Sequence, residues 1–151
     1  MISQKLVELI EANAEELTGR WLKEVRVHRD TPKYRTLPEE ELRQRAFHVY
    51  SHLGRWVGHE EHNEEVEESY KALGAVRLRE GFRLSEVVAA LTITKNVLWV
   101  FVLSRGFFDS VVQVYQTLEL YNSVVTYFDR AVLYTISGYE TAAEQGLRRV
   151  S

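Results

Sequence analysis

The residues best suited to metal chemistry are the five histidines, all at or before position 62. His48 and His52 are four residues apart, a spacing that puts two imidazoles on one helix face and can hold a metal ion. Arg45 and Arg55 share that face, and their positive charge opposes cation binding. His59–Glu68 adds two histidines beside several glutamates but fixes no third ligand. We therefore predict a solvated polar face and no metal site.

Haem binding and covalent catalysis lack the residues that they need. Haem iron in a globin takes an axial histidine from the later half of the fold, but no His or Cys follows His62, and the sole methionine is Met1. The absence of cysteine also excludes disulfides and thiolate sites. No glutamate stands three residues before a histidine, as in the di-metal helical bundles, and no phosphate-binding glycine loop occurs. We predict no cofactor and no enzymatic activity.

A dense charged cluster surrounds the turn expected near Gly81. Such a cluster can hold an anion or a partner domain, but exposed ion pairs are also common and contribute at most about 1 kcal/mol each. We predict surface ion pairs here. The cluster consists of Arg77, Arg79, Glu80, Arg83 and Glu86.

Composition indicates one soluble domain spanning 1–151. The chain is 45% hydrophobic and 27% charged, with a net charge of −3. That balance is ordinary for a globular protein, and the negative charge argues against nucleic acid as a partner. The most apolar run, Val97–Leu103, is too short to span a bilayer. We predict a cytoplasmic protein that uses no membrane.

The elements that carry these residues are predicted to be helices, because the chain has two prolines, eight glycines and no alternating apolar pattern. Apolar residues recur at helical spacing in five segments, and the fourth is apolar nearly all round, as a central helix should be. We expect helices from Ser3 to about His28, from a capping box at Thr36–Glu39 to Gly58, from Asn63 to Gly81, over Ser85–Ser104, and over Asp109–Ala143.

The last segment, Asp109–Ala143, carries two apolar rows. One row docks a helix on its own domain, so the second suggests another partner, and the likeliest is a copy of the chain. Five of the eight tyrosines lie here, and tyrosine is enriched at protein interfaces. The predicted dimer residues are Leu118, Tyr121, Val125, Phe128, Val132 and Tyr139; the row expected to face the domain's own core is Leu120, Val124, Tyr127, Ala131 and Tyr134.

Four stretches carry a resemblance to a known family: Leu17–Leu22, Leu37–Leu42, Ala75–Val87 and Val97–Trp99. Their order resembles the N-terminal sensory domain of RsbR-type stressosome co-antagonists, which is similar to domains found before histidine kinase and PucR-type regulator modules. The resemblance implies a dimeric, helical, non-haem globin-like or bundle fold that acts as an input domain. Residues 1–151 contain no STAS region and no kinase motif, so the family's phosphorylation chemistry is carried onto no residue, and a stand-alone sensor and a fragment of a longer protein both remain open.

The sequence thus predicts a non-catalytic all-α regulatory domain of about five helices. It would dimerise through the long C-terminal helix and pass a signal along it to an attached output domain or a partner signalling protein. The alternative is a globin-like sensor that binds a small apolar molecule or a cofactor in its core.

Overall fold

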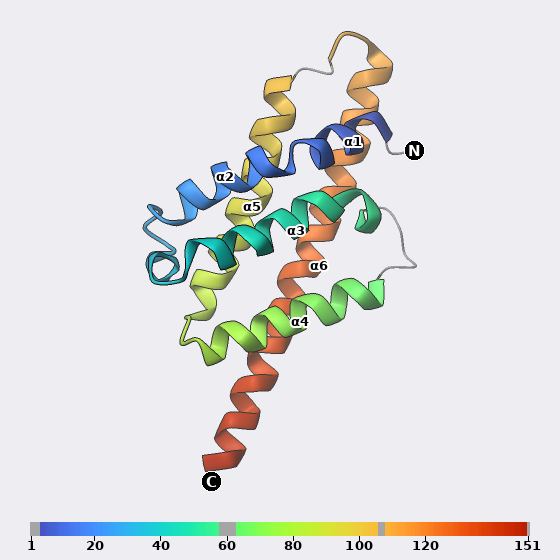
Figure 1. Cartoon of the computed structure of the whole chain (residues 1–151). Helices are drawn as coiled ribbons and strands as arrows, with labels where there is room; N and C mark the ends of the chain where they lie inside the picture. The colour runs from blue at the N-terminus through green and yellow to red at the C-terminus, as the bar shows by residue number, and fades with distance from the viewer. Residues whose placement is uncertain (1–3, 58–62, 106–107, 151) are drawn as a thin grey trace.

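The computed structural model describes residues 4–57, 63–105 and 108–150, and it is all-helical over these ranges (Figure 1). This confirms the all-α prediction and the long C-terminal helix, with one helix more than expected. The elements are α1 (Gln4–Ala12), α2 (Ala14–Val25), the short 3-10 helix η1 (Pro32–Arg35), α3 (Glu39–Trp56), α4 (Asn63–Arg79), α5 (Leu84–Arg105) and α6 (Val111–Val150).

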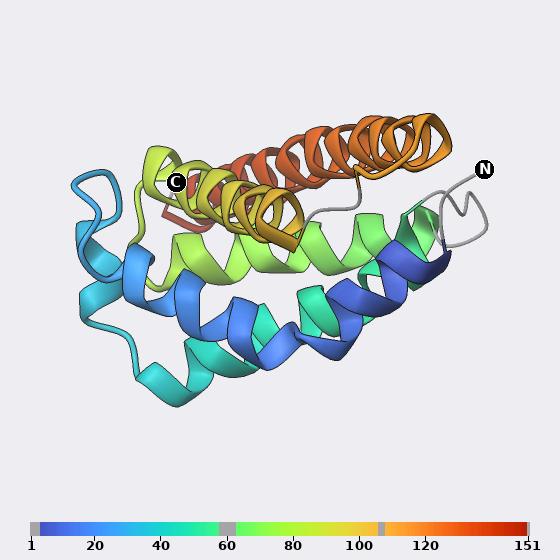
Figure 2. The same ribbon diagram turned by 90° about the horizontal axis from the view of Figure 1, so that it is seen from above.

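The helices pack in two groups. α1 and α2 lie against α3, while α6 lies against α4 and α5, and contacts between α2 and α5 join the groups. Figure 2 shows α5 and α6 side by side on the face opposite α2 and α3. Among the described residues, α3 and α4 make little backbone contact although they follow each other in the chain. The space between them is therefore filled by side chains or left as a groove.

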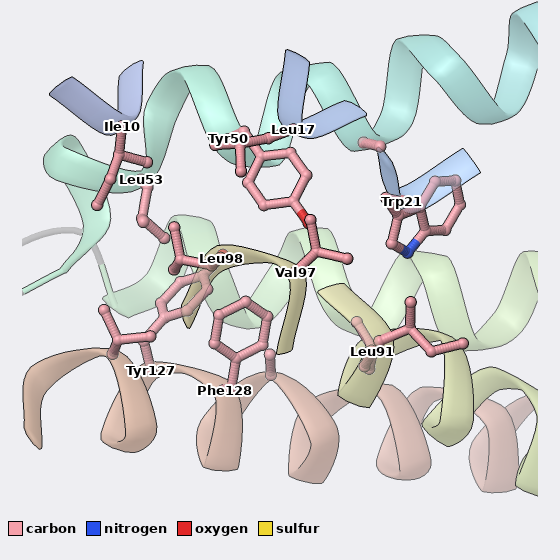
Figure 3. Close-up of a cluster of buried hydrophobic side chains, with 14 of the residues drawn as sticks. Ile10, Leu17, Trp21, Tyr50, Leu53, Leu91, Val97, Leu98, Tyr127 and Phe128 are labelled. Atoms are coloured by element: carbon pink, nitrogen blue, oxygen red, sulfur yellow. The ribbon is translucent and has the colours of Figure 1, made fainter. Parts of the chain in front are cut away.

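The helix predicted to be central, α5, is the middle of the core. Leu98 and Phe101 are fully buried, and Figure 3 shows Leu98 facing Tyr127 and Phe128 of α6. α5 is long and apolar enough to cross a membrane by length and composition, but half of its most apolar window is buried inside the protein. Its buried residues are Glu86, Val87, Ala90, Leu91, Ile93, Thr94, Val97, Leu98, Phe101 and Val102.

The extra helix arises because the first predicted helix is broken at Asn13. The Asn13 side chain donates a hydrogen bond from Nδ2 to the Leu9 carbonyl at 2.7 Å, and α2 begins at the next residue. Asparagine side chains compete with the backbone in this way, which lowers their helix propensity. The predicted start at Ser3 lies outside the described residues.

Three predicted helix caps are wrong, although the helices they were meant to begin are present. Thr36 donates its hydroxyl to the Lys33 carbonyl at 2.6 Å, so it caps nothing, and α3 starts after Pro38. α5 begins at Leu84, which puts Ser85 inside the helix. Asp109 is replaced as the cap of α6 by Ser110, whose Oγ accepts the Gln113 amide at 3.2 Å.

Two helix ends match the sequence. α4 begins at Asn63, and Gly81 follows its end with a φ of 84°. Glycine adopts this left-handed conformation without the strain that a Cβ atom adds. The predicted stop at Gly58 lies outside the described residues. α6 continues past Ala143 to Val150, so its 40 residues span about 60 Å.

α4 and α6 cross at two glycines, which the sequence analysis did not single out. A Cβ atom on Gly138 would lie 2.0 Å from the Lys71 carbonyl oxygen, and one on Gly74 would lie 2.1 Å from the Thr135 carbonyl oxygen. Each glycine therefore meets the backbone of the opposite helix directly. α4 and α6 accordingly share the most extensive helix contact among the described residues.

We predict that Gly138→Ala destabilises the domain by about 2 kcal/mol or more, because neither backbone can yield to the added methyl group without the helices moving apart. The matched control is Gly146→Ala in the same helix, where nothing lies within 4 Å of the new Cβ atom. That variant should be neutral or up to about 1 kcal/mol more stable. Urea denaturation followed by circular dichroism measures both, and equal effects would contradict the close crossing.

Candidate functional site

A groove lies between α3 and α4, where the two helices make little backbone contact. It encloses a cavity of about 370 Å³, within the range of small-molecule sites. Most of the lining is apolar or aromatic. The lining residues are Gln44, Arg45, His48, Val49 and Trp56 from α3, with Ser69, Tyr70, Ala72, Leu73 and Val76 from α4.

A second cavity of about 60 Å³ extends this groove into the core. Arg45, Val49, Tyr70 and Leu73 line both cavities, so we treat the two together as the α3–α4 groove. The remaining residues of the inner cavity come from α2, η1, α3, α4 and α5: Trp21, Tyr34, Ala46, Arg77, Val87, Ala90, Leu91 and Thr94.

Arg77 marks the inner end of the groove, and it corrects the prediction of surface ion pairs. Its side chain is 3% exposed, and Nη1 donates to Glu80 Oε1 at 2.7 Å. The guanidinium carbon lies 5.3 Å from the ring centroid of Tyr34 and 5.1 Å from that of Phe82. Such cation–π contacts are stronger where water is excluded.

Glu86 is the second member of the predicted surface cluster that is buried. It is 6% exposed, and Oε2 accepts the Lys33 amide at 2.9 Å. The carboxylate therefore ties η1 to the start of α5. Arg79 and Arg83 are exposed, as the surface prediction required.

Hydroxyl groups beside the groove are paired within the protein. The Tyr50 hydroxyl donates to the Thr94 carbonyl at 2.9 Å, and the hydroxyls of Tyr70 and Tyr127 lie 2.6 Å apart. Burial raises the pKa of Tyr70 to about 12, and burial also raises the pKa of Tyr50 and Tyr127 well above the usual value. These phenols consequently stay protonated at neutral pH and serve as structural hydrogen-bond groups.

The histidine pair lies at the outer edge of the groove. The rings of His48 and His52 are 4.3 Å apart, and His52 stacks on Trp56 at 6.0 Å. Partial burial lowers the pKa of His48, with His52 acting in the same direction and Glu65 against it. Within the described residues no group of three potential ligands gathers around a metal position. His59 and His62 lie outside those residues.

The predicted dimer residues divide into three groups. Leu118 and Tyr121 are 61% and 51% exposed. Val125, Val132 and Tyr139 are half-buried, and the Tyr139 hydroxyl donates to the Phe82 carbonyl at 2.6 Å.

Phe128 is the member of that row which the structure places inside its own subunit, at 3% exposure. The expectation that it faces a partner is wrong for this conformation. The residues expected to face the core do so: Leu120, Val124, Tyr127 and Ala131 are buried, and Tyr134 packs on the core from a half-buried position.

Exposed apolar side chains gather at the start of α6, and we call this set the outer row. Trp99 of α5 borders it, with its ring 4.9 Å from that of Tyr121. Asn122 and Thr126, both exposed, follow the outer row along α6. Contiguous apolar surface with a polar rim is typical of an interaction site. The outer row consists of Val111, Val112, Val114, Tyr115, Leu118 and Tyr121, which are 39% to 86% exposed.

A comparison with protein families matches residues 15–151 to the model described as the RsbT co-antagonist protein rsbRD N-terminal domain. The chain belongs to this family. The match covers every described helix except α1 and the first residue of α2. Neither the curated proteins nor the solved structures contain a match. The family is one of regulatory co-antagonist domains, so the chain is a signalling domain of the stressosome type.

Three features of this RsbRD N-terminal domain escaped the sequence analysis. Gly74 and Gly138 stand inside helices, where glycine costs stability, and that cost was the available signal of a close crossing. Arg77 follows the buried Tyr70 and the half-buried Leu73 at helical spacing, so its position on the inner face was detectable. The Trp99–Tyr121 contact joins different helices and left no local signal.

We predict that this RsbRD N-terminal domain loses stability between pH 10 and pH 12. The Tyr70 phenol titrates near 10 when unfolded and near 12 when folded. Its protonated form therefore stabilises the fold fully below pH 10, and this contribution is lost as the pH rises through 12. Urea denaturation across this range measures the loss. In Tyr70→Phe the free energy of unfolding should fall less between pH 10 and pH 12 than in the wild type. The control Tyr115→Phe, at a 62% exposed position, should lose as much stability as the wild type. Equal losses in the two variants would contradict the assignment to Tyr70.

Proposed function

We propose that this domain is a non-catalytic input module that forms a homodimer through the outer row of α6 and passes its conformational state along that helix. The observation that carries the proposal is the division of α6 into two parts. Its middle is held in the core by Leu120, Val124 and Phe128, while its start presents apolar side chains to water. In a two-fold symmetric dimer the same surface of each subunit contacts its copy, so both outer rows would be buried together.

Self-association is favoured by the chemistry of the outer row. Val111 and Leu118 are 86% and 61% exposed and lie on one side of the helix, seven residues apart, the spacing of a helix–helix seam. Tyr115 and Tyr121 add aromatic rings with polar tips, which suit an interface core. No charged side chain interrupts the outer row until Glu119, which is half-buried.

A non-catalytic role is supported by the use of the buried hydroxyls. Thr18, Thr94 and Thr135 each donate to the carbonyl four residues earlier in their own helix, at 2.7 to 2.8 Å. The Tyr50 hydroxyl is likewise held by a backbone carbonyl. These groups are engaged in holding the helices and do not converge on a position where a substrate would react.

Relay along α6 is supported by its length and its contacts. Gly138, in the second half of α6, packs directly against the backbone of α4, so a shift of α4 moves α6 with it. Its last residues, Gln145–Arg149, are exposed, and three of the five are polar. Arg148 and Arg149 place positive charge at the C-terminal end, where the helix dipole favours it. This end is the part of α6 that we expect to contact an output domain or a partner signalling protein in the cytoplasm.

A ligand-sensing role is the second candidate, and the α3–α4 groove favours it. A cavity of about 370 Å³ beside α4 is a place where a small molecule can change the position of that helix. Sensing and dimer relay are compatible, because α4 separates the groove from α6.

We predict that Leu118→Asp converts the dimer to a monomer without loss of helix content, because the side chain is already 61% exposed in the single subunit. A charge buried at the seam would lose its hydration without gaining a partner. Sedimentation equilibrium at micromolar concentration measures the change, and circular dichroism checks the fold. The matched control, Asn96→Asp at an exposed position of α5 that faces α2 and not the outer row, should remain a dimer.

Phe128→Asp provides the contrast, since its side chain is 3% exposed and packs within the subunit. This variant should unfold rather than dissociate. A wild-type protein that sediments as a monomer, or a Leu118→Asp protein that sediments like wild type, would overturn the proposed interface.

A further inference from the structure

Arg77 carries a buried hydrogen-bond donor with no acceptor. Its Nε is enclosed but has no hydrogen-bond partner in the described structure, although Nη1 is paired with Glu80. Leaving a buried donor unpaired lowers the stability of the folded state, and it does so more strongly for a charged group. Such a group in a folded protein needs an explanation, and Arg77 lines the inner end of the α3–α4 groove.

Arg45 brings a second guanidinium to the same end. It lines both cavities of the groove, and within the part of the chain that the structure describes its ion pair is with Glu41, reached from Nη2 at 2.9 Å. An arginine has five N–H donors, so a single carboxylate contact leaves others for a ligand. Glu41 and Glu80 keep 41% and 24% of their side chains exposed, which lets water screen their negative charge.

Both arginines act on the residue that lines the inner cavity between them. Tyr34 lines that cavity, and Arg77 and Arg45 each act to lower its pKa against the larger effect of burial, while the opposing action of Glu86 is weaker than either. The inner end therefore offers two guanidinium groups to an anion.

Apolar side chains form much of the remaining groove wall, and the groove is long. Val49, Leu73 and Val76 line it between the arginines and Trp56. Arg45 and Trp56 are eleven residues apart on α3, which corresponds to roughly 16 Å at 1.5 Å per residue. A chain of methylene groups fits such a lining, because the burial of each group removes apolar surface from water.

We propose that the α3–α4 groove binds an amphiphilic carboxylate, with the carboxylate at Arg45 and Arg77 and the apolar chain running toward Trp56. The carboxylate would supply the acceptor that Arg77 Nε lacks, in a charge-assisted hydrogen bond. The chain would press on Leu73 and Val76 of α4, the helix that meets α6 at Gly74 and Gly138. This inference rests on the sensing role among the proposed functions and names the class of molecule sensed.

The test uses decanoate as the probe and decan-1-ol as its neutral analogue, with binding measured by isothermal titration calorimetry. Tryptophan fluorescence gives a second readout, since Trp21 and Trp56 line the groove. We expect decanoate to bind one site per subunit, at least tenfold more tightly than decan-1-ol. Equal binding of the two would overturn the carboxylate assignment.

Arg77→Met should weaken decanoate binding at least tenfold and leave decan-1-ol binding unchanged. The matched control is Arg79→Met, at an exposed arginine on the same helix, which should bind as wild type. If Arg77→Met does not fold, the half-exposed pair Arg45→Met and Arg43→Met makes the same comparison, because Arg43 lies outside the groove. Equal losses in the variant and its control would contradict the proposed contact.

Ala72→Trp separates this groove from other apolar surfaces. Ala72 is exposed at the groove mouth, so the larger side chain should block decanoate without disturbing the fold. Unchanged binding in Ala72→Trp would show that the probe sits elsewhere and would overturn the proposal. Sedimentation of the ligand-free protein tests the proposed dimer separately. A protein that forms the dimer but does not bind decanoate would overturn the ligand proposal and leave the proposed dimer standing.

Discussion

The close crossing of α4 and α6 is the constraint on which the rest of the structure depends. At Gly74 and Gly138 each helix touches the other's backbone, and no side chain lies between them to absorb a displacement. The crossing fixes which face of α6 turns inward, and so it buries Phe128 and leaves Leu118 in water. Interfaces packed this tightly respond to strain by moving as units rather than by deforming.

α4 consequently has two roles in the domain. One side of it forms a wall of the α3–α4 groove through Tyr70, Leu73 and Val76, and the other side holds α6. Because α3 makes little backbone contact with α4, their separation is set by side chains and whatever occupies the groove. The signal path that we propose runs through the groove, the crossing and the outer row, with α4 as its moving part.

The sequence was sufficient to predict the helices but not their relative placement. Period and composition predicted all-α structure, the buried α5 and the core-facing row from Leu120 to Ala131, since each depends on spacing within one segment. The caps at Thr36, Ser85 and Asp109 were wrong for three different local reasons. Thr36 donates its hydroxyl to a carbonyl, α5 begins one residue before Ser85, and the Ser110 hydroxyl accepts the amide that Asp109 was expected to bind. Phe128 was assigned to a partner because it belongs to the heptad row of Leu118 and Tyr121. In the structure it is buried with the neighbouring row, beside Val124 and Tyr127. Arg77 was placed on the surface because charge usually lies there, and only the tertiary packing of Tyr34 and Phe82 around its guanidinium reveals otherwise.

The unbroken helicity of α6 from Val111 to Val150 has a consequence for anything joined to it. A helix that continues from this end inherits its rotational phase, since each residue turns the chain by about 100°. A single inserted residue would point an attached module in a different direction, whereas an insertion of seven would restore its azimuth to within about 20° while adding about 10 Å of reach. The direction in which an attached module points would therefore depend on the rotational phase of α6 more than on the distance to the module.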